Sequence, residues 1–303
     1  MSATGVRGLL VPITTPFDPV TGALAPVTLR ANARSLLAAG VHGIVAGGST
    51  GEAALLDEDE YRHVVEWLRD VVPEDRLLVA GAGRESTRAT IAACQIAGDL
   101  GADAVLVRAP AYYGASLSSA ALADHFRHVA DASPVPVLLY NIPKYTHVAL
   151  SDQLLAALAD HGNIAGAKDS SGDLRNFAAY RAAAPHWAML MGSGSHWYAA
   201  LELGAAGGIL ALGNFAAPLA VEVWRAFASG DRPGAGAVQE RLTPLNKGTV
   251  GERGVPGVKA AMDLVGLAGG PVRPPLLDLA SGERDTVAAL LRDAGLGRGA
   301  ASR

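Results

Sequence analysis

Residues 151–168 read Ser-Asp-Gln-Leu-Leu-Ala-Ala-Leu-Ala-Asp-His-Gly-Asn-Ile-Ala-Gly-Ala-Lys and contain one helix followed by one strand. The pair Ser151-Asp152 has the residue types that cap the start of a helix, and Leu154–Ala159 continues as the helix. Gly162 is typical of a helix end. Ile164–Ala167 is then a short apolar run, as expected for a strand of a parallel sheet that is buried on both faces.

The same helix-and-strand unit recurs along the whole chain. Apolar runs occur at Leu9–Ile13, Gly43–Ala46, Leu77–Ala80, Ala104–Val107, Val137–Tyr140, Ile164–Ala167, Ala188–Met191 and Gly208–Leu212. Helix-start residues precede most of the intervening segments, at Thr28, Asp57, Ser86, Ser118 and Ser151. Eight such units predict an α/β fold, a closed (β/α)8 TIM barrel. An open, doubly wound parallel sheet is the alternative.

The C-terminal part of the chain is longer than a barrel needs. No linker-like stretch occurs before roughly Gly230–Gly236, so we expect residues 1–230 to form the catalytic barrel. Residues 231–303 are expected to form a small helical extension. Its apolar positions include Leu242, Leu245, Met262, Leu264, Val265, Val287, Leu290 and Leu291.

Composition excludes several classes of protein. Half of the 303 residues are hydrophobic and 18% are charged, which allows a large core. A net charge of −4 does not suggest a nucleic-acid or polybasic membrane surface. The start, Met1–Arg7, lacks the layout of a signal peptide, and no apolar run reaches the ~18 residues of a membrane span. We therefore expect a cytoplasmic protein whose single cysteine, Cys94, is a packed core thiol.

Polar residues and glycines follow the apolar runs. In a parallel barrel the ends of all the strands meet at one rim, where barrel enzymes carry their reacting groups. The rim segments are Thr14–Pro16, Gly47–Glu52, Gly81–Arg84, Pro110–Tyr113, Tyr140–Pro143, Lys168–Ser171, Gly192–Gly194 and Leu212–Asn214. Lys168 stands out among them, because the chain has four lysines against 21 arginines.

Lys168 ends a buried strand, so its amine is expected inside the barrel mouth. Desolvation there favours the neutral amine, which can attack a ketone and form an imine. The protonated imine draws electrons from a neighbouring carbon–carbon bond, which can then break or form. The alternative is a lysine that merely pairs with Asp169 at the strand end.

Two further rim segments suit a small anionic substrate. In Gly48-Ser49-Thr50-Gly51-Glu52 the glycines let the backbone approach a ligand, and exposed amides with two hydroxyls suit a carboxylate. An ordinary tight turn is the alternative. The segment lacks the Gly-Lys-Ser/Thr ending of a P-loop, and the dinucleotide fingerprint fails at Gly81–Ser86. Tyr140-Asn141-Ile142-Pro143 places a phenol at a strand end, where it can be structural or catalytic.

Together these motifs resemble the dihydrodipicolinate synthase / N-acetylneuraminate lyase family of pyruvate-dependent class I aldolases. The resemblance covers nearly the whole chain. It includes Pro12–Phe17, the Gly-Ser-Thr-Gly-Glu turn, Tyr140–Pro143, Gly166–Asp169 and Gly254–Lys259. The interval of 28 residues from Tyr140 to Lys168 also fits the family.

The resemblance assigns roles to individual residues. Lys168 matches the Schiff-base lysine and Tyr140 the tyrosine that shuttles protons at the imine. Ser49 matches the hydroxyl of the proton relay, and Tyr113 matches a relay tyrosine that a neighbouring subunit lends. Thr50 matches the residue that holds the pyruvate carboxylate.

The resemblance also implies an assembly and the rest of the pyruvate site. Beside Gly48, which lets the backbone approach the ligand, Ile209 matches a position whose backbone carbonyl faces pyruvate. The family is usually a homotetramer, a dimer of dimers, and lending Tyr113 requires at least a dimer. No metal and no organic cofactor is implied.

Departures from the family pattern concern the second substrate. Synthases carry an arginine where this chain has Tyr145. The preceding Lys144 either replaces the missing positive charge or is a solvated loop lysine. The sialic-acid lyases carry acidic residues after the glycine that corresponds to Gly192. Ser193 and Gly194 stand there in this chain, which disfavours a nine-carbon sugar. The run that begins at Lys168 is closer to branches that act on 2-oxo-3-deoxy sugar acids or 4-hydroxy-2-oxoglutarate.

The expected function is therefore a lyase that joins pyruvate to an aldehyde or releases it through an imine on Lys168. Alternatives with the same imine are 4-hydroxy-tetrahydrodipicolinate synthase and a dehydratase of 3-deoxy-2-oxo acids. A non-catalytic sugar-acid binding or regulatory protein on this scaffold is a second class. A metal-dependent aldolase is a third, but the eight histidines are scattered, and His125 and His128 are expected on a helix facing solvent or a partner.

Overall fold

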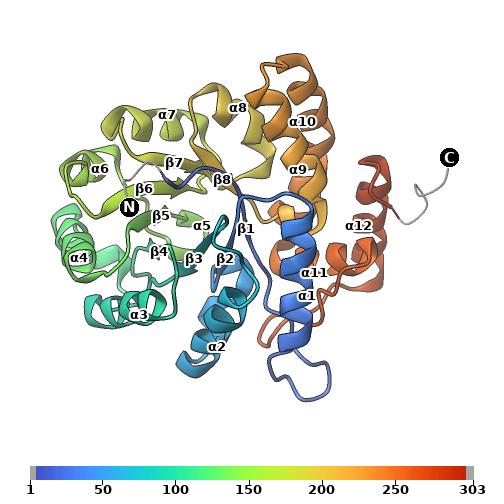
Figure 1. The fold of residues 1–303 in the computed structure, drawn as a ribbon, viewed down its shortest axis with the longest axis horizontal. Coiled ribbons are helices and arrows are strands. Elements are labelled where there is room, and N and C mark those ends of the chain that lie inside the picture. The colour runs from blue at the N-terminus through green and yellow to red at the C-terminus, as the bar shows by residue number, and fades with distance from the viewer. Residues whose placement is uncertain (1–4, 298–303) are drawn as a thin grey trace.

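The computed structural model describes residues 5–297, so parts of Met1–Arg7 and of the C-terminal tail lie outside it. Eight parallel strands form a closed barrel in chain order, and β1 pairs with β8. Helices surround the barrel (Figure 1). The strands are β1 (Gly8–Pro12), β2 (Gly43–Ala46), β3 (Leu77–Gly81), β4 (Ala104–Arg108), β5 (Val137–Asn141), β6 (Ile164–Asp169), β7 (Ala188–Met191) and β8 (Gly207–Ile209). The predicted TIM barrel is confirmed, and closure between β1 and β8 excludes the open sheet.

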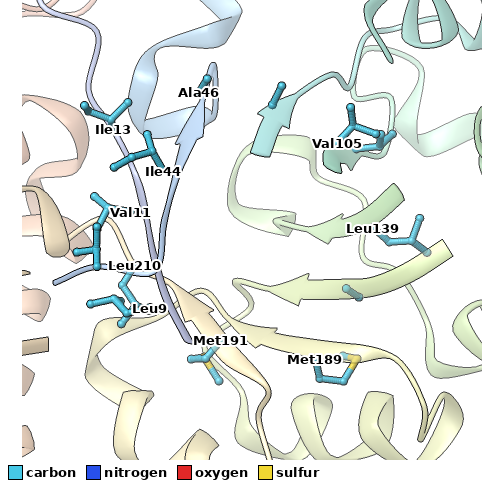
Figure 2. Packing of buried hydrophobic residues seen from close by; sticks show 14 of the residues in the cluster. Leu9, Val11, Ile13, Ile44, Ala46, Val105, Leu139, Met189, Met191 and Leu210 are labelled. Atoms are coloured by element: carbon cyan, nitrogen blue, oxygen red, sulfur yellow. The ribbon is translucent and has the colours of Figure 1, made fainter. Parts of the chain in front are cut away.

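The strands are buried on both faces, as their apolar runs predicted. Alternate residues of a strand point to opposite faces. Side chains such as Leu10, Val45 and Leu190 form the cluster inside the barrel. Their neighbours, such as Leu9 and Ile44, belong to the larger cluster between strands and helices, part of which Figure 2 shows.

Most helices begin where the sequence predicted. The helices of the barrel are α1 (Pro26–Ala38), α2 (Glu58–Arg69), α3 (Thr87–Asp99), α4 (Ser119–Ala132), α5 (Pro143–Thr146), α6 (Asp152–Leu158), α7 (Leu174–Ala183), α8 (Trp197–Glu202) and α9 (Gly213–Ala228). Short 3-10 turns are η2 (Ser49–Gly51), η3 (Ala53–Leu55), η4 (Gly114–Ser116) and η5 (Gly194–His196). The side chains of Asp57, Ser86, Ser118 and Ser151 each cap a helix by accepting a backbone N–H hydrogen bond.

Two boundaries differ from the sequence prediction. Helix α1 begins at Pro26, before Thr28, because proline at the first helical position needs no N–H partner and its φ already suits a helix. Strand β8 ends at Ile209, and the predicted run to Leu212 is wrong. There the backbone turns toward α9, with the Gly213 amide donating to the Leu210 carbonyl at 3.0 Å.

The C-terminal extension packs along one side of the barrel (Figure 1). It consists of α10 (Arg232–Asn246), the π-helical turn η6 (Lys247–Gly251), α11 (Glu252–Val265) and α12 (Ser281–Asp293). The extension is helical as predicted. The expected linker over Gly230–Gly236 is wrong, because Asp231 caps α10 and the helix already begins at Arg232.

Buried polar groups bear on three further expectations. Cys94 is fully buried in the core, as predicted, and burial raises the pKa of its thiol to about 12. His128 is exposed on α4 as expected, but the expectation of a solvent-facing His125 is wrong. His125 is buried, and its Nδ1 is 2.9 Å from the Thr87 hydroxyl of α3.

Within residues 5–297, no helix is both long and apolar enough to cross a membrane.

Candidate active site

Lys168 and Tyr140 lie side by side on adjacent strands. The register of β5 and β6 pairs Tyr140 with Lys168, so both side chains point into the barrel mouth. The Lys168 Nζ lies 4.1 Å from the centre of the Tyr140 ring. Lys168 is 5% exposed and Tyr140 is 6% exposed. The arrangement holds an amine and a phenol together in a mostly buried space.

Asp169 does not pair with Lys168. Successive strand residues face opposite sides, which points Asp169 away from the barrel interior. Its Oδ1 accepts hydrogen bonds from the Asn141 side chain at 2.8 Å and the Ser171 amide at 3.0 Å. Its Oδ2 accepts from the Ser171 hydroxyl at 2.8 Å. No ion pair joins Lys168 to Asp169 in the described part of the chain, so the amine is not held in a strand-end salt bridge.

The Gly-Ser-Thr-Gly-Glu segment forms the turn η2 directly after β2. Its Gly51 carbonyl accepts a hydrogen bond from the Thr15 hydroxyl at 2.7 Å, which fixes the turn to the segment after β1. Glu52 closes the turn with a φ of 57°, in the left-handed region that a non-glycine residue rarely adopts. Such a conformation persists only where surrounding contacts hold it.

Most of the predicted site residues line one cavity at this rim. They are Ser49, Thr50, Tyr140, Tyr145, Lys168, Gly192, Ser193 and Ile209. Gly48 does not line the cavity itself, although it directly precedes the turn that does. Tyr113 also stays outside: it is 71% exposed and its ring packs edge-on against Tyr112, with centroids 4.9 Å apart.

The proton relay expected from the resemblance is not assembled within this single chain. Ser49 and Tyr140 share the cavity, but among residues 5–297 their hydroxyls make no hydrogen bond to each other. Tyr113 is exposed on the loop after β4. The relay therefore stays a prediction.

Sequence reasoning missed the wall that the C-terminal extension adds to the cavity. Asn246, Val250, Gly251, Gly254, Val255 and Val258 all line it. Gly254 has a φ of 58° and a ψ of −143°, a conformation open to glycine, and it interrupts the helix there. A Cβ added at Gly254 would lie 3.8 Å from the Tyr145 hydroxyl. The motif Gly254–Lys259 was the available signal, but no role could be read from it.

Beyond Lys168, the described residues that line the cavity contribute a second lysine and no acidic side chain. The Lys144 Nζ donates to the Gly251 carbonyl at 2.9 Å, so this lysine lies at the cavity and contacts the extension. Burial, and then the neighbouring Tyr140, raise the pKa of Tyr145. No aspartate or glutamate is among the described residues that line the cavity. Neutral hydroxyls and a second lysine thus face the remaining space.

Metal-binding side chains are not gathered at this rim. Between residues 5 and 297, no three histidine, cysteine, aspartate or glutamate side chains come together as a metal site would require. The cavity itself is lined by two lysine amines, two phenols and several hydroxyls.

Comparison with known proteins identifies the family. Residues 5–294 match the model of the dihydrodipicolinate synthetase family. The chain belongs to this family. As a member of the dihydrodipicolinate synthetase family it is a pyruvate-dependent aldolase or lyase, a class I enzyme that makes or breaks a carbon–carbon bond.

Relatives in the dihydrodipicolinate synthetase family match almost end to end. An uncharacterised DapA-like lyase of Halobacterium salinarum is 38% identical, and the match covers 96% of this chain and 95% of the relative. A 4-hydroxy-tetrahydrodipicolinate synthase of Methanopyrus kandleri is 35% identical, with 96% and 97% covered. The crystal structure of YagE from E. coli K12 in complex with pyruvate superimposes with a TM-score of 0.91 at 30% identity, with 96% and 99% covered.

Proposed function

We propose that Lys168 is the Schiff-base residue and that Tyr140 is its proton shuttle. The observation that carries this proposal is the pairing of the two side chains across β5 and β6, with the Lys168 Nζ 4.1 Å from the Tyr140 ring centre. The Asp169 carboxylate, which is bonded to Asn141 and Ser171 and not to Lys168, further supports a catalytic rather than a strand-end role for the lysine.

The proposed reaction begins when the neutral amine of Lys168 attacks the ketone carbon of pyruvate. The carbonyl oxygen leaves as water and a carbon–nitrogen double bond forms. Loss of a methyl proton gives an enamine, whose carbon attacks the aldehyde carbon, and the aldehyde oxygen takes up a proton. Tyr140 carries these protons. Water then hydrolyses the imine, which releases the product and restores the amine; cleavage runs the same steps in reverse.

The turn η2 is proposed to hold the pyruvate carboxylate. Ser49 and Thr50 line the cavity with Lys168, and their hydroxyls and the backbone of a 3-10 turn offer donors to an anion. Thr50 is the proposed binding residue and Ser49 the first hydroxyl of the relay. Gly48, which precedes the turn, and Ile209, which lines the same cavity, complete the proposed pyruvate half.

For the second substrate we propose a 2-oxo-3-deoxy sugar acid or 4-hydroxy-2-oxoglutarate in the cleavage direction. Tyr145, Gly192 and Ser193 line the cavity with neutral groups that suit the hydroxyls of such a substrate, and Lys144 adds a cation. A second candidate function is that of a 4-hydroxy-tetrahydrodipicolinate synthase, as in the 35%-identical relative from Methanopyrus kandleri. A dehydratase of 3-deoxy-2-oxo acids is distinguished by its products, because only the aldolase releases free pyruvate.

We propose further that the active assembly is a homotetramer, a dimer of dimers, in which Tyr113 completes the site of a neighbouring subunit. The support is the exposure of Tyr112 and Tyr113, at 81% and 71%, on a loop outside their own cavity. One of the similar solved structures is a monomeric dihydrodipicolinate synthase variant, so the assembly needs its own test.

Borohydride reduction in the presence of pyruvate tests the imine. We expect one pyruvyl adduct, located at Lys168 by peptide mass spectrometry, because hydride reduces the imine to a stable amine. A Lys168→Arg variant, which keeps the charge but not the nucleophile, should remain unmodified. Labelling at Lys144 instead, or no labelling of the wild type, would disprove the assignment.

A further inference from the structure

Glu52 ends the Gly-Ser-Thr-Gly-Glu turn, and its carboxylate is completely buried. We propose that Lys259 neutralises this carboxylate so that the turn η2 can accept a substrate anion, which makes Glu52 and Lys259 positioning residues for the pyruvate site. The proposal rests on the proposed role of η2 in carboxylate binding. It gives a function to two residues that the sequence motifs contained but to which no role had been assigned.

The ion pair between Glu52 and Lys259 is the most deeply buried in the described chain. The Lys259 Nζ lies 2.5 Å from Glu52 Oε1, and the two side chains are 2% and 0% exposed. The same ammonium donates to the Pro271 carbonyl at 2.7 Å and lies 4.5 Å from the centre of the Phe17 ring. Burial lowers the pKa of Lys259, and the charge of Glu52 opposes that effect.

Arg273 contacts the other oxygen of the Glu52 carboxylate. Its backbone amide donates to Glu52 Oε2 at 2.8 Å. Its guanidinium holds both carboxylate oxygens of Glu60 on α2, at 2.5 and 2.7 Å, and donates to the Leu55 carbonyl at 2.8 Å. These contacts fix the C-terminal extension to Glu52 at the end of η2 and to Glu60 in the first turn of α2.

The charge of Glu52 explains why its ion pair with Lys259 matters for binding of the pyruvate carboxylate. Glu52 stands two residues after Thr50, so an unneutralised carboxylate there would repel the carboxylate of pyruvate, and low-dielectric surroundings strengthen that repulsion. Lys259, which does not itself line the cavity, cancels this charge. Val258, the residue before Lys259, lines the cavity, so one turn of α11 reaches both the substrate space and the buried pair.

A merely structural ion pair and a neutralising one predict different results. Removing either partner of a structural pair damages the turn and weakens pyruvate binding in both variants. Under the neutralisation proposal the two variants move in opposite directions. Lys259→Gln leaves the negative charge alone beside the turn, whereas Glu52→Gln leaves a positive one.

The experiment measures the pyruvate concentration for half-maximal borohydride trapping at Lys168 in the full-length protein. We expect Lys259→Gln to raise it about tenfold, Glu52→Gln to leave it unchanged or lower it, and the double variant to return to within about threefold of the wild type. A Lys259→Arg variant, which keeps the charge, should stay near the wild type. Val129→Ala, in the buried face of α4 and away from the site, controls for lost stability alone.

The outcomes separate the two proposals. No trapping in the wild type overturns the proposed function and this inference with it. Normal trapping in the wild type, with equal half-saturation in all variants or a rise in both single variants, overturns the neutralising role and leaves the imine chemistry intact. Should Lys259→Gln not fold, the double variant and Glu52→Gln still decide, because a rise in both of them contradicts neutralisation.

Discussion

At the scale of single residues, strand alternation separates Lys168 from Asp169. The two are adjacent in the sequence, yet Lys168 faces the cavity and Asp169 bonds to Asn141 and Ser171 on the other side of the sheet. The sequence left both a catalytic lysine and a strand-end ion pair open. The choice depended on which face each residue occupies, and a bulge between β5 and β6 shifts that register by one residue.

The Tyr140→Phe variant tests the proposal that Lys168 is the nucleophile and Tyr140 the proton shuttle. Removing the hydroxyl takes away the proton shuttle while the nucleophile stays, so we expect kcat to fall by roughly 10²–10⁴-fold. Pyruvate trapping at Lys168 should still occur, more slowly. The comparison of steady-state turnover with borohydride labelling checks this, and an unchanged kcat would remove Tyr140 from the mechanism.

At the scale of elements, local signals predicted helix starts better than strand ends. Asp57 and Ser86 cap their helices because a side-chain oxygen satisfies a nearby backbone N–H, which is a local interaction readable from sequence. The end of β8 at Ile209 was not readable, since Leu210 and Leu212 are as apolar as strand residues. The chain turns there into α9, which packs on β1, a contact between segments far apart in the sequence.

The contact between α3 and α4 gives the fold a pH dependence. Burial lowers the pKa of His125 to about 4, and its Nε2 is buried with no hydrogen-bond partner among the described residues. The unfolded chain, with a pKa near 6.5, binds the proton more readily, so the free energy of unfolding falls as pH drops from about 6.5 to about 4. The loss is at most of the order of 3 kcal/mol.

Urea unfolding between about pH 8 and pH 4 measures this effect. A His125→Gln variant should lose much of the acid dependence, because glutamine does not titrate in this range. His128→Gln is the matched control, three residues along α4 and exposed. Identical pH profiles for the wild type and His125→Gln would show that the histidine does not cause the acid sensitivity.

At the scale of the whole molecule, the extension completes the cavity. Sequence reasoning predicted a helical addition and placed Ser49, Tyr140 and Lys168 on one rim, because rim residues follow from strand ends, and these residues do line one cavity. It could not predict that Val250 and Gly254 would wall the cavity, since this depends on how α10 and η6 turn the chain back over the rim. The roles that the resemblance assigns to Tyr113 and Ser49 stay predictions.

Mixing two inactive variants tests whether Tyr113 acts across subunits. Lys168→Ala and Tyr113→Phe protomers are each expected to have low activity. If Tyr113 serves a neighbour, hybrid oligomers formed by unfolding and refolding them together contain sites with an intact lysine and an intact tyrosine, so activity should exceed the sum of the separate samples. Activity equal to that sum would mean that Tyr113 acts within its own chain or not at all.

The wall contributed by α11 has a consequence for synthesis on the ribosome. The chain is made from its N-terminus, so Lys168 emerges long before Val258 and Lys259. Until those residues follow, the rim lacks its side wall, and the buried carboxylate of Glu52 lacks its cation. A nascent chain that has completed its eight strands therefore carries Lys168 without a finished pocket. We expect the pocket to be complete only after α11 has been synthesised.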